Sequence, residues 1–259
     1  MLALRSHTQC IASVVSPLGS SAIKRCFLSK PSRTVSDRRG CNMAAKASLG
    51  IWVKGDPENK VLGDCPFSHR ALLTMEEKKL EYERDYIDFA KKPDWLLEVN
   101  PEGSVPVLKD GEKWVVDSGT IVEYLEENYP LPSVPADEEG DQATGGVFKA
   151  FREFLFNKED SEEKEKEAAL VVELAKVDAL LKKRGGPFLG GESFNAADAS
   201  VLPKLYHMKT ALGEYKKWTI PDSLPNLLSY IAKAAERPSW KNTDYGTDMI
   251  LKGWGKHFS

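Results

Sequence analysis

The sequence predicts a small α/β domain followed by an all-helical domain, within a chain of 259 residues. Between residues 49 and 130, short apolar runs alternate with helical spacings, which is typical of strands connected by helices. After residue 137 the strand pattern disappears and amphipathic helical patterns follow. The proline-containing stretch 131–137 is predicted to be a stiff linker. We therefore expect one domain at 43–130 and a second at 138–259.

The composition limits the kinds of partner that the chain can have. Hydrophobic residues make up 41% and charged residues 29%, which is ordinary for a soluble globular protein. No apolar run approaches the roughly twenty residues of a membrane helix, so stable membrane association is not expected. The net charge is −3, and the body after residue 42 is acidic without a basic stripe. This charge argues against nucleic acid as a partner.

Residues 1–42 differ from the rest of the chain in charge. They hold seven Lys or Arg against one acid, Asp37, and they are rich in serine without a long apolar segment. This composition is typical of an organellar transit peptide, whereas a secretory signal needs an apolar core of about seven to fifteen residues. The richness in serine favours the chloroplast stroma over the mitochondrion. The alternative is a disordered tail that carries no address.

The cysteines are concentrated near the start of the chain. Three of the four lie in the first 42 residues, and the remainder holds only Cys65. That distribution excludes a disulfide framework or a multi-cysteine metal site in the body and suits a reducing compartment. The four histidines lack metal-ligand spacing, so we expect no metal. Among them, His69 either acts on Cys65 or faces solvent, and we assign it no chemistry.

The first domain begins with a strand–helix–strand pattern. Residues 49–54 read as an apolar strand, and 55–63 read as a turn-rich loop. Residues 69–79 carry apolar positions at helical spacing, and 80–87 alternate charged and apolar residues as a strand does. A helical crossover between two strands predicts a parallel pair.

A helix and a hairpin follow in this domain. Residues 93–99 read as a short helix, 104–108 as a strand, and 109–113 as a hairpin turn. Pro106 cannot donate to a sheet ladder. A cis bond before it is one solution, and it would leave the backbone of Val105 to pair with a ligand.

Asp117 and Ser118 precede the last helix of the domain, residues 119–128. Their side chains can cap that helix. Together with the helix N-terminus, they can also hold the charged groups of a small ligand. The sequence leaves both readings open.

The stretch Gly63–Ser68 places Cys65 at the start of the first helix. The first N–H groups of a helix lack an internal partner and the helix dipole is positive there, so both favour a thiolate. Pro66 suits the first helical turn. Ser68 stands where a dithiol motif would have its second cysteine, so any second thiol must come from outside. The alternative is a buried cysteine that serves as a small hydrophobe.

The second domain reads as helices throughout. Amphipathic patterns cover 147–156, 168–183 and 224–236, the last of which is expected to end before Pro238. The charged stretch 158–167 is predicted to be a solvated helix end or loop.

A further helix follows Asn195, with Pro203 as the expected site of a kink. Asn195 can cap this helix, and Asp198, three residues on, can reach back to it in a capping box. We expect this pair to serve folding and not chemistry.

Four stretches of the first domain together resemble a known family: Gly63-Asp-Cys-Pro-Phe-Ser68, Lys92-Pro-Asp-Trp95, Asn100-Pro-Glu-Gly-Ser-Val-Pro-Val107 and Asp117-Ser118. The element order, with a cysteine at the first helix, resembles the thioredoxin-like fold, and the four stretches are similar to a glutathione transferase N-terminal domain. The helix after Asn195 extends the resemblance over nearly all of 49–259. The plant dehydroascorbate reductases are the most similar branch.

The resemblance implies a glutathione transferase fold, a thioredoxin-like domain followed by a helical one. It also implies reduction of dehydroascorbate to ascorbate, with glutathione as co-substrate and no bound cofactor. Cys65 would act as a monothiol through a mixed disulfide with glutathione, with glutathione transferase activity on the side. Lys54 and Asp64 would line the dehydroascorbate pocket beside Cys65. The residues implied to hold glutathione are Lys92, Val105, Asp117 and Ser118.

Three other functions stay open on the sequence. The first is another cysteine-type transferase or thioltransferase, and the second is a binding or membrane-inserting protein that resembles the chloride intracellular channels. Charges at 76–79 interrupt the apolar span that the second would need. The third is a structural protein with a vestigial site. The resemblance also implies a monomer.

Overall fold

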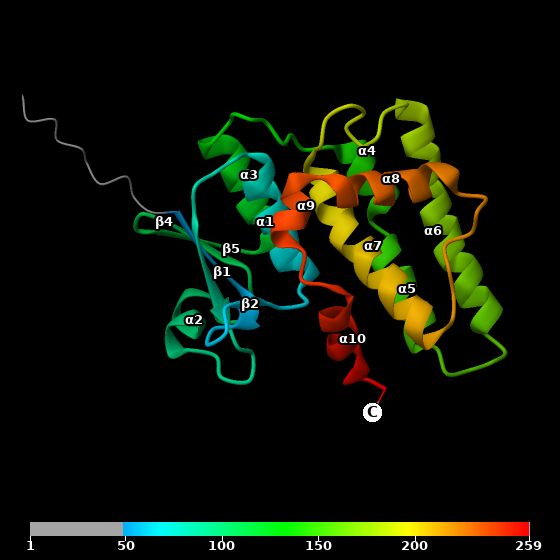
Figure 1. Ribbon diagram of the computed structural model, residues 1–259, viewed down its shortest axis with the longest axis horizontal. Helices are drawn as coiled ribbons and strands as arrows, with labels where there is room; N and C mark the ends of the chain where they lie inside the picture. The colour runs from blue at the N-terminus through cyan, green and yellow to red at the C-terminus, as the bar shows by residue number, and fades with distance from the viewer. Residues whose placement is uncertain (1–48, 259) are drawn as a thin grey trace, which may run out of the picture. The chain divides into compact units, whose positions relative to one another are not determined.

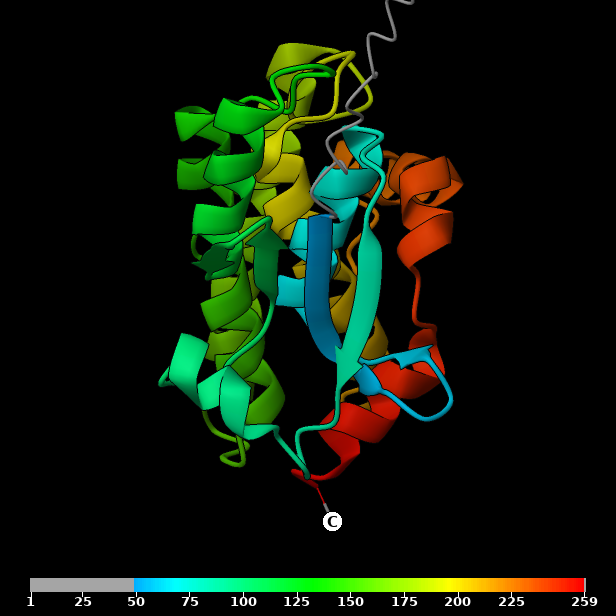
Figure 2. The same cartoon turned by 90° about the vertical axis from the view of Figure 1, so that its left-hand side faces the viewer.

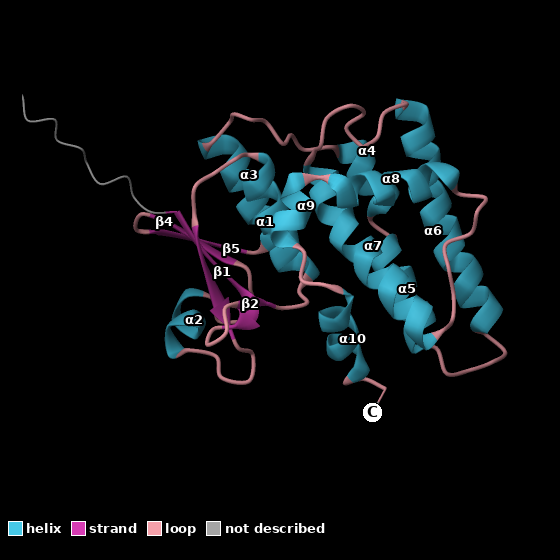
Figure 3. Ribbon diagram, in the orientation of Figure 1, coloured by secondary structure: helices cyan, strands magenta, loops and turns pink. Residues whose placement is uncertain are grey.

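A sheet with flanking helices, followed by a group of helices, makes up the computed structural model, which describes residues 49–258 (Figure 1). Figure 3 separates the strands from the helices by colour. This α/β part followed by an all-helical part confirms the predicted fold class. The predicted transit peptide, 1–42, lies outside the described residues. The domain borders at 43–130, 131–137 and 138–259 stay predictions.

Strand β1 lies at the centre of the sheet, whose strands are β1 (Leu49–Asp56), β2 (Val61–Leu62), β3 (Glu83–Ile87), β4 (Val107–Asp110) and β5 (Lys113–Val116). It pairs in parallel with β3 and antiparallel with β2 and β4, and β5 pairs with β4. The parallel pair confirms the predicted crossover. The sequence did not predict β2, because a two-residue strand is too short to show an alternating pattern.

Helices cover both faces of this sheet: α1 (Pro66–Glu77), α2 (Asp94–Val99) and α3 (Ser118–Asn128). Successive side chains of a strand point to opposite faces. Ile51 and Val53 of β1 therefore pack with α1 and α3, whereas Trp52 packs against α2. Figure 2 shows the strands in front of α1. The Val105–Pro106 bond before β4 is cis, one of the alternatives that the sequence left open.

The remaining described helices form the second part of the fold: α4 (Glu138–Thr144), α5 (Val147–Phe156), α6 (Glu163–Arg184), α7 (Ala196–Tyr215), α8 (Pro225–Glu236), α9 (Pro238–Thr243) and α10 (Thr247–Gly255). Helix α7 is central and packs against α1, α4, α5, α8 and α10. Helix α10 returns to the first part of the fold, because its Ile250 is fully buried in the core formed by the sheet, α1 and α3.

Some predictions for these helices were wrong in detail. Helices α4 and α10 were not predicted. The charged stretch 158–167 is a loop as far as Glu162 and the start of α6 from Glu163, which agrees with the predicted helix end or loop. Pro238 follows the end of α8 as expected, but it also begins α9. Proline is tolerated in the first helical turn because its missing N–H has no partner there.

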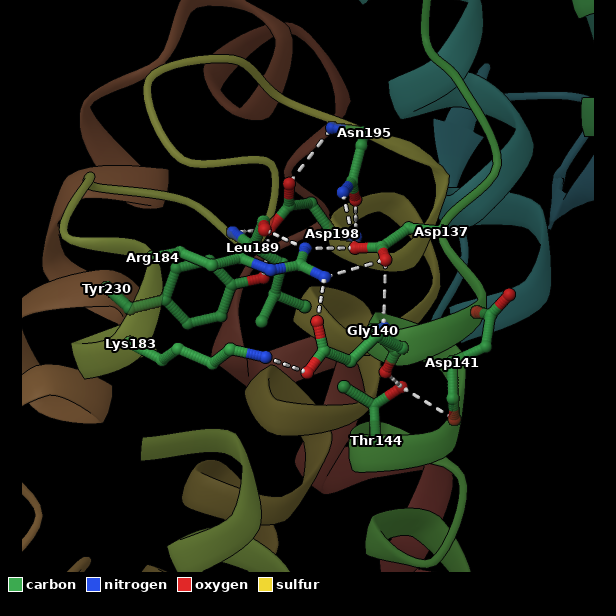
Figure 4. Close-up of polar contacts among 11 residues, drawn as sticks. Asp137, Gly140, Asp141, Thr144, Lys183, Arg184, Leu189, Asn195, Asp198 and Tyr230 are labelled. Atoms are coloured by element: carbon green, nitrogen blue, oxygen red, sulfur yellow. Dashed lines mark hydrogen bonds and ion pairs between the residues drawn. The ribbon is translucent and has the colours of Figure 1, made fainter. Parts of the chain in front are cut away.

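A polar network fixes the start of α7 (Figure 4). The Asn195 side chain accepts from the N–H of Asp198 at 3.0 Å, and the Asp198 side chain accepts from the N–H of Asn195 at 2.9 Å, which confirms the predicted capping box. Asp198 also accepts from the Leu189 N–H and the Tyr230 hydroxyl. Burial raises the pKa of Asp198 to about 6. A hydrogen bond from Arg184 lowers the pKa of neighbouring Asp137 to about 2.

Candidate active site

Cys65 is the N-cap of α1, as the sequence predicted. Its sulfur accepts a hydrogen bond from the Ser68 N–H, with N and Sγ 3.4 Å apart. The side chain is half-buried, and Pro66 occupies the first turn. The unpaired N–H groups and the helix dipole therefore act on a sulfur that solvent can reach.

Asp64, the residue before Cys65, forms an ion pair with Lys54. Lys54 Nζ and Asp64 Oδ1 are 2.7 Å apart, with the Lys54 side chain 31% exposed and that of Asp64 12% exposed. The chain is held here by the Gly63 N–H, which donates to the Lys54 carbonyl at 2.8 Å. Both predicted dehydroascorbate residues thus meet near the end of β1, and one of them, Asp64, directly precedes Cys65.

Helix α10 closes one side of this ion pair. A Cβ added to Gly253 would overlap Asp64 Oδ2, so the helix backbone lies directly against the carboxylate. Lys54 and Asp64 line a cavity of about 430 Å³ together with Phe89 and residues of α10, among them Gly253 and Lys252. No sequence pattern pointed to α10 as part of the site.

The predicted glutathione residues divide into two groups. Lys92 is exposed, and its Nζ lies 4.7 Å from the centre of the Phe89 ring, which also faces Lys54 Nζ at 5.7 Å. Asp117 and Ser118 lie at the start of α3, where Asp117 at φ 72° accepts from two N–H groups of the helix. The ammonium groups of Lys92 and Lys54 thus both lie near the ring of Phe89.

Val105 and Ser118 of this set are both buried, at 6% and 3% exposure. Val105 precedes the cis bond that leads into β4. For Asp117, the capping role that the sequence left open is present. A ligand-binding role for these residues stays a prediction.

His69 does not face solvent, which corrects one of the two alternatives for it. It is fully buried one turn after Cys65, and its Nε2 lies 2.9 Å from Thr243 Oγ1. Burial, with a smaller contribution from His207, lowers the pKa of His69 to about 3, so the ring is neutral. The burial comes from α9, 174 residues further along the chain, which no local pattern could indicate.

Arg70, the next residue, was not singled out from the sequence. Its Nη1 lies 3.4 Å from the position that a Cβ on Gly119 would occupy, at the start of α3. Burial lowers its pKa against the opposing charges of Asp141, Asp117 and Glu123. Within residues 49–258, its Nε and His69 Nδ1 are the buried side-chain N and O atoms without a hydrogen-bond partner.

Neither a bilayer-spanning helix nor a cluster of metal-binding side chains is present within residues 49–258. No helix there is both long and apolar enough to cross a bilayer. No cluster of three or more His, Cys, Asp or Glu in the same stretch has an arrangement that could hold a metal ion.

The fold and the N-cap cysteine define the class of protein, that of the glutathione transferases. The family model "Glutathione S-transferase, N-terminal domain" matches residues 64–128, and the model "Glutathione S-transferase, C-terminal domain" matches 166–233. The first match begins one residue before Cys65 and ends with α3. The second covers most of the helical part.

Known proteins narrow the class. Glutathione S-transferase DHAR3, chloroplastic, of Arabidopsis thaliana is 43% identical, over 98% of this chain and 98% of its own. The crystal structure of dehydroascorbate reductase from Chlamydomonas reinhardtii is 41% identical with a TM-score of 0.75, over 82% of this chain and 100% of that one. Human chloride intracellular channel protein 3 is 25% identical, over 81% of this chain and 97% of its own. The chain belongs to the dehydroascorbate reductase branch of the glutathione transferases.

Proposed function

We propose that the protein reduces dehydroascorbate to ascorbate with glutathione as the reductant and Cys65 as the reacting sulfur. The observation that carries this proposal is the position of Cys65 at the N-cap of α1, next to the Lys54–Asp64 ion pair. Conjugating transferases activate glutathione with a serine or tyrosine. A cysteine at that place makes the protein itself the nucleophile and favours redox chemistry.

In the first half of the proposed cycle, dehydroascorbate takes up two electrons and one proton and becomes the ascorbate anion. The electrons come from the Cys65 thiolate and one glutathione thiol, whose sulfurs join in a mixed disulfide, and that thiol supplies the proton. A second glutathione thiolate then attacks the glutathione sulfur. The bond to Cys65 breaks, its electron pair returns to Sγ, and oxidised glutathione leaves.

The roles of the other residues follow from their charge and place. The ammonium group of Lys54 can donate to an oxygen of dehydroascorbate, while Asp64 holds that ammonium group in position. Lys92, exposed beside Phe89, would meet a glutathione carboxylate. Asp117 and Ser118 would take the γ-glutamyl end at the start of α3, and the Val105 backbone would pair with the cysteinyl amide.

The proposal has a cellular setting. The chloroplast stroma, with the mitochondrion as the alternative, suits residues 1–42 and the chloroplastic relative. We propose a monomer that needs no bound cofactor or metal and has glutathione transferase activity on the side. Import into isolated chloroplasts tests the location, and sedimentation tests the oligomeric state.

The decisive variant is Cys65→Ser. Ascorbate formation from dehydroascorbate and glutathione, followed by ultraviolet absorbance, should fall about a thousandfold or more, because the nucleophile is lost. Cys41→Ser is the matched control, since it removes a thiol from the predicted transit peptide and should leave turnover unchanged. Activity retained in Cys65→Ser would exclude the mechanism.

A thioltransferase is the second candidate, and an open aromatic surface favours it. Phe67, two residues from Cys65, is 44% exposed and stacks edge-on against Phe148 at 6.2 Å. A cavity of about 600 Å³ lies beside these rings. Such room suits a bulky disulfide. Release of glutathione from a glutathionylated peptide, without ascorbate formation, would support this candidate over the reductase.

A further inference from the structure

The last turn of α10 is weak by composition, and it lies against the Lys54–Asp64 ion pair. The helix has only nine residues, and isolated helices of this length are marginal in water. Gly253 lies in the last turn, and a glycine inside a helix disfavours the helical state about fivefold relative to alanine. Helix α10 therefore depends on its packing against the rest of the fold.

Close approach of other groups explains the two glycines of this turn. A Cβ on Gly253 would overlap the Asp64 carboxylate, and a Cβ on Gly255 would lie 3.2 Å from the Tyr215 hydroxyl oxygen. The backbone of the turn therefore contacts Asp64 on one side and Tyr215 of α7 on another. The same approach that places α10 against the carboxylate excludes the side chains that would strengthen the helix.

Aromatic rings at the end of the described chain pack against the neighbours of this turn. The chain reverses after α10, where the Phe258 N–H donates to the Gly255 carbonyl at 3.0 Å. The Phe258 ring stacks on Tyr215, with ring centres 4.3 Å apart and planes at 13°, and on Phe156, at 5.8 Å and 21°. The Tyr215 hydroxyl donates to the Leu251 carbonyl at 3.1 Å. We call Phe156, Tyr215 and Phe258 the aromatic clamp.

The aromatic clamp connects α10 to the helical part of the fold. Phe156 is the last residue of α5, and Tyr215 is the last residue of α7. On the other side of α10, Ile250 is fully buried in the core of the sheet, α1 and α3. Phe258 is 43% exposed, so its two ring stacks hold it more than burial in a core does. Helix α10 is thus fixed between the two parts of the fold.

We infer that Phe258 is a positioning residue for the Lys54–Asp64 ion pair and that it acts through α10. Its ring holds the last turn closed, and the closed turn keeps the Gly253 backbone against Asp64. The Asp64 carboxylate in turn lies 2.7 Å from Lys54 Nζ.

Without the aromatic clamp the last turn would open, because helix ends fray first. Asp64 would then lose the backbone that limits its motion, and Lys54 would lose its fixed acceptor. The effect of Phe258 on turnover rests on the proposed function.

The first test is amide hydrogen exchange in α10, measured by mass spectrometry. Phe258→Ala removes both ring stacks, so the amides of residues 252–255 should exchange about tenfold faster. Phe258→Tyr keeps the ring and should restore the normal rate. Val172→Ala is the matched control, because it shortens a side chain of similar exposure, 57%, on α6 and should leave exchange in α10 unchanged. An unchanged rate in Phe258→Ala would overturn the inference.

Turnover tests the step from α10 to the ion pair. In Phe258→Ala the KM for dehydroascorbate should rise about threefold, because only the closed turn offers a fixed ion pair to the substrate. The KM for glutathione should stay unchanged, and Phe258→Tyr should restore the KM for dehydroascorbate. Faster exchange with an unchanged KM would remove Phe258 from the positioning of the site. Exchange needs neither substrate, so this result is distinct from absence of turnover in the unmodified protein, which would contradict the proposed function.

Discussion

The start of α7 and the first turns of α1 differ in whether their buried polar groups have hydrogen-bond partners. The Asp198 carboxylate accepts from Leu189, Asn195 and Tyr230, with distances of 2.8–2.9 Å (Figure 4). Behind Cys65, by contrast, His69 Nδ1 and Arg70 Nε have no partner among residues 49–258. The saturated region holds the helices together. The unsaturated pair lies in the first turns of α1, the helix that Cys65 caps.

This difference separates stability from function. An unsatisfied buried polar group costs about 1–3 kcal/mol, so most are paired in native proteins. Two adjacent unsatisfied groups in α1 are tolerated only if other contacts of the fold offset their free-energy cost. Local conflicts of this kind concentrate at functional sites. Changes in the Asp198 network should therefore lower stability and leave the sulfur alone, while changes near α10 should do the reverse.

The largest effect is expected from Asp198→Ala. It leaves three buried donors without an acceptor and should lower the free energy of unfolding by about 3–5 kcal/mol, measured by urea denaturation. The alkylation rate of Cys65 in the folded protein should stay within about twofold of its normal value. A large change in that rate would contradict the separation of the two regions.

The buried histidines and Asp198 should change the stability of the fold in opposite directions as pH changes. His69 and His207, with pKa values lowered to about 3, stabilise the fold above their ordinary value of 6.5 and lose this contribution as pH falls. Asp198 has its pKa raised to about 6, so it stabilises the fold fully at pH values below its ordinary pKa of 3.8. This contribution to stability is lost as pH rises. Between pH 6 and 4, the unfolded chain binds two of these protons and the folded chain binds one.

From these three groups, stability should fall by about 1.4 kcal/mol per pH unit as pH drops from 6 to 4. Asp198→Asn removes the opposing group, so its slope should be about twice as steep. Urea denaturation at several pH values measures both slopes. Equal slopes in the two proteins would mean that Asp198 does not titrate in this range.

The smallest effect is expected from Gly253→Ala. Its Cβ would overlap the Asp64 carboxylate and displace it from Lys54, so the KM for dehydroascorbate should rise about tenfold, or ~1.4 kcal/mol. Gly213→Ala is the control, because its Cβ would meet only the Trp218 carbonyl at 4.0 Å and should stabilise α7 by about 0.5–1 kcal/mol. An unchanged KM in Gly253→Ala would remove α10 from the site.

What the sequence could predict depended on local chemistry. Pro66 and the turn before it were enough to place Cys65 at the start of a helix, and the spacing of Asn195 and Asp198 was enough for the capping box. The strand–helix–strand pattern predicted the parallel pair. Each of these features lies within a few turns of chain, where propensity and spacing act directly.

The missing parts of the site depend on contacts between distant segments. The burial of His69 comes from α9, and the approach of Gly253 to Asp64 depends on how α10 returns to the sheet. Helix α10 is short, and a glycine in it gives no sign that a carboxylate lies against it.

Ser68 has a consequence for how the protein would behave in a cell under stress. It is fully buried, its oxygen accepting from the backbone of Lys54, and it occupies the place of a resolving thiol. In the proposed cycle, oxidised Cys65 therefore cannot form an intramolecular disulfide with a cysteine at position 68. Its recovery is a bimolecular event whose speed follows the concentration of free glutathione. Such an enzyme would slow as that pool is drained, and ascorbate recycling would follow the cell's supply of reductant.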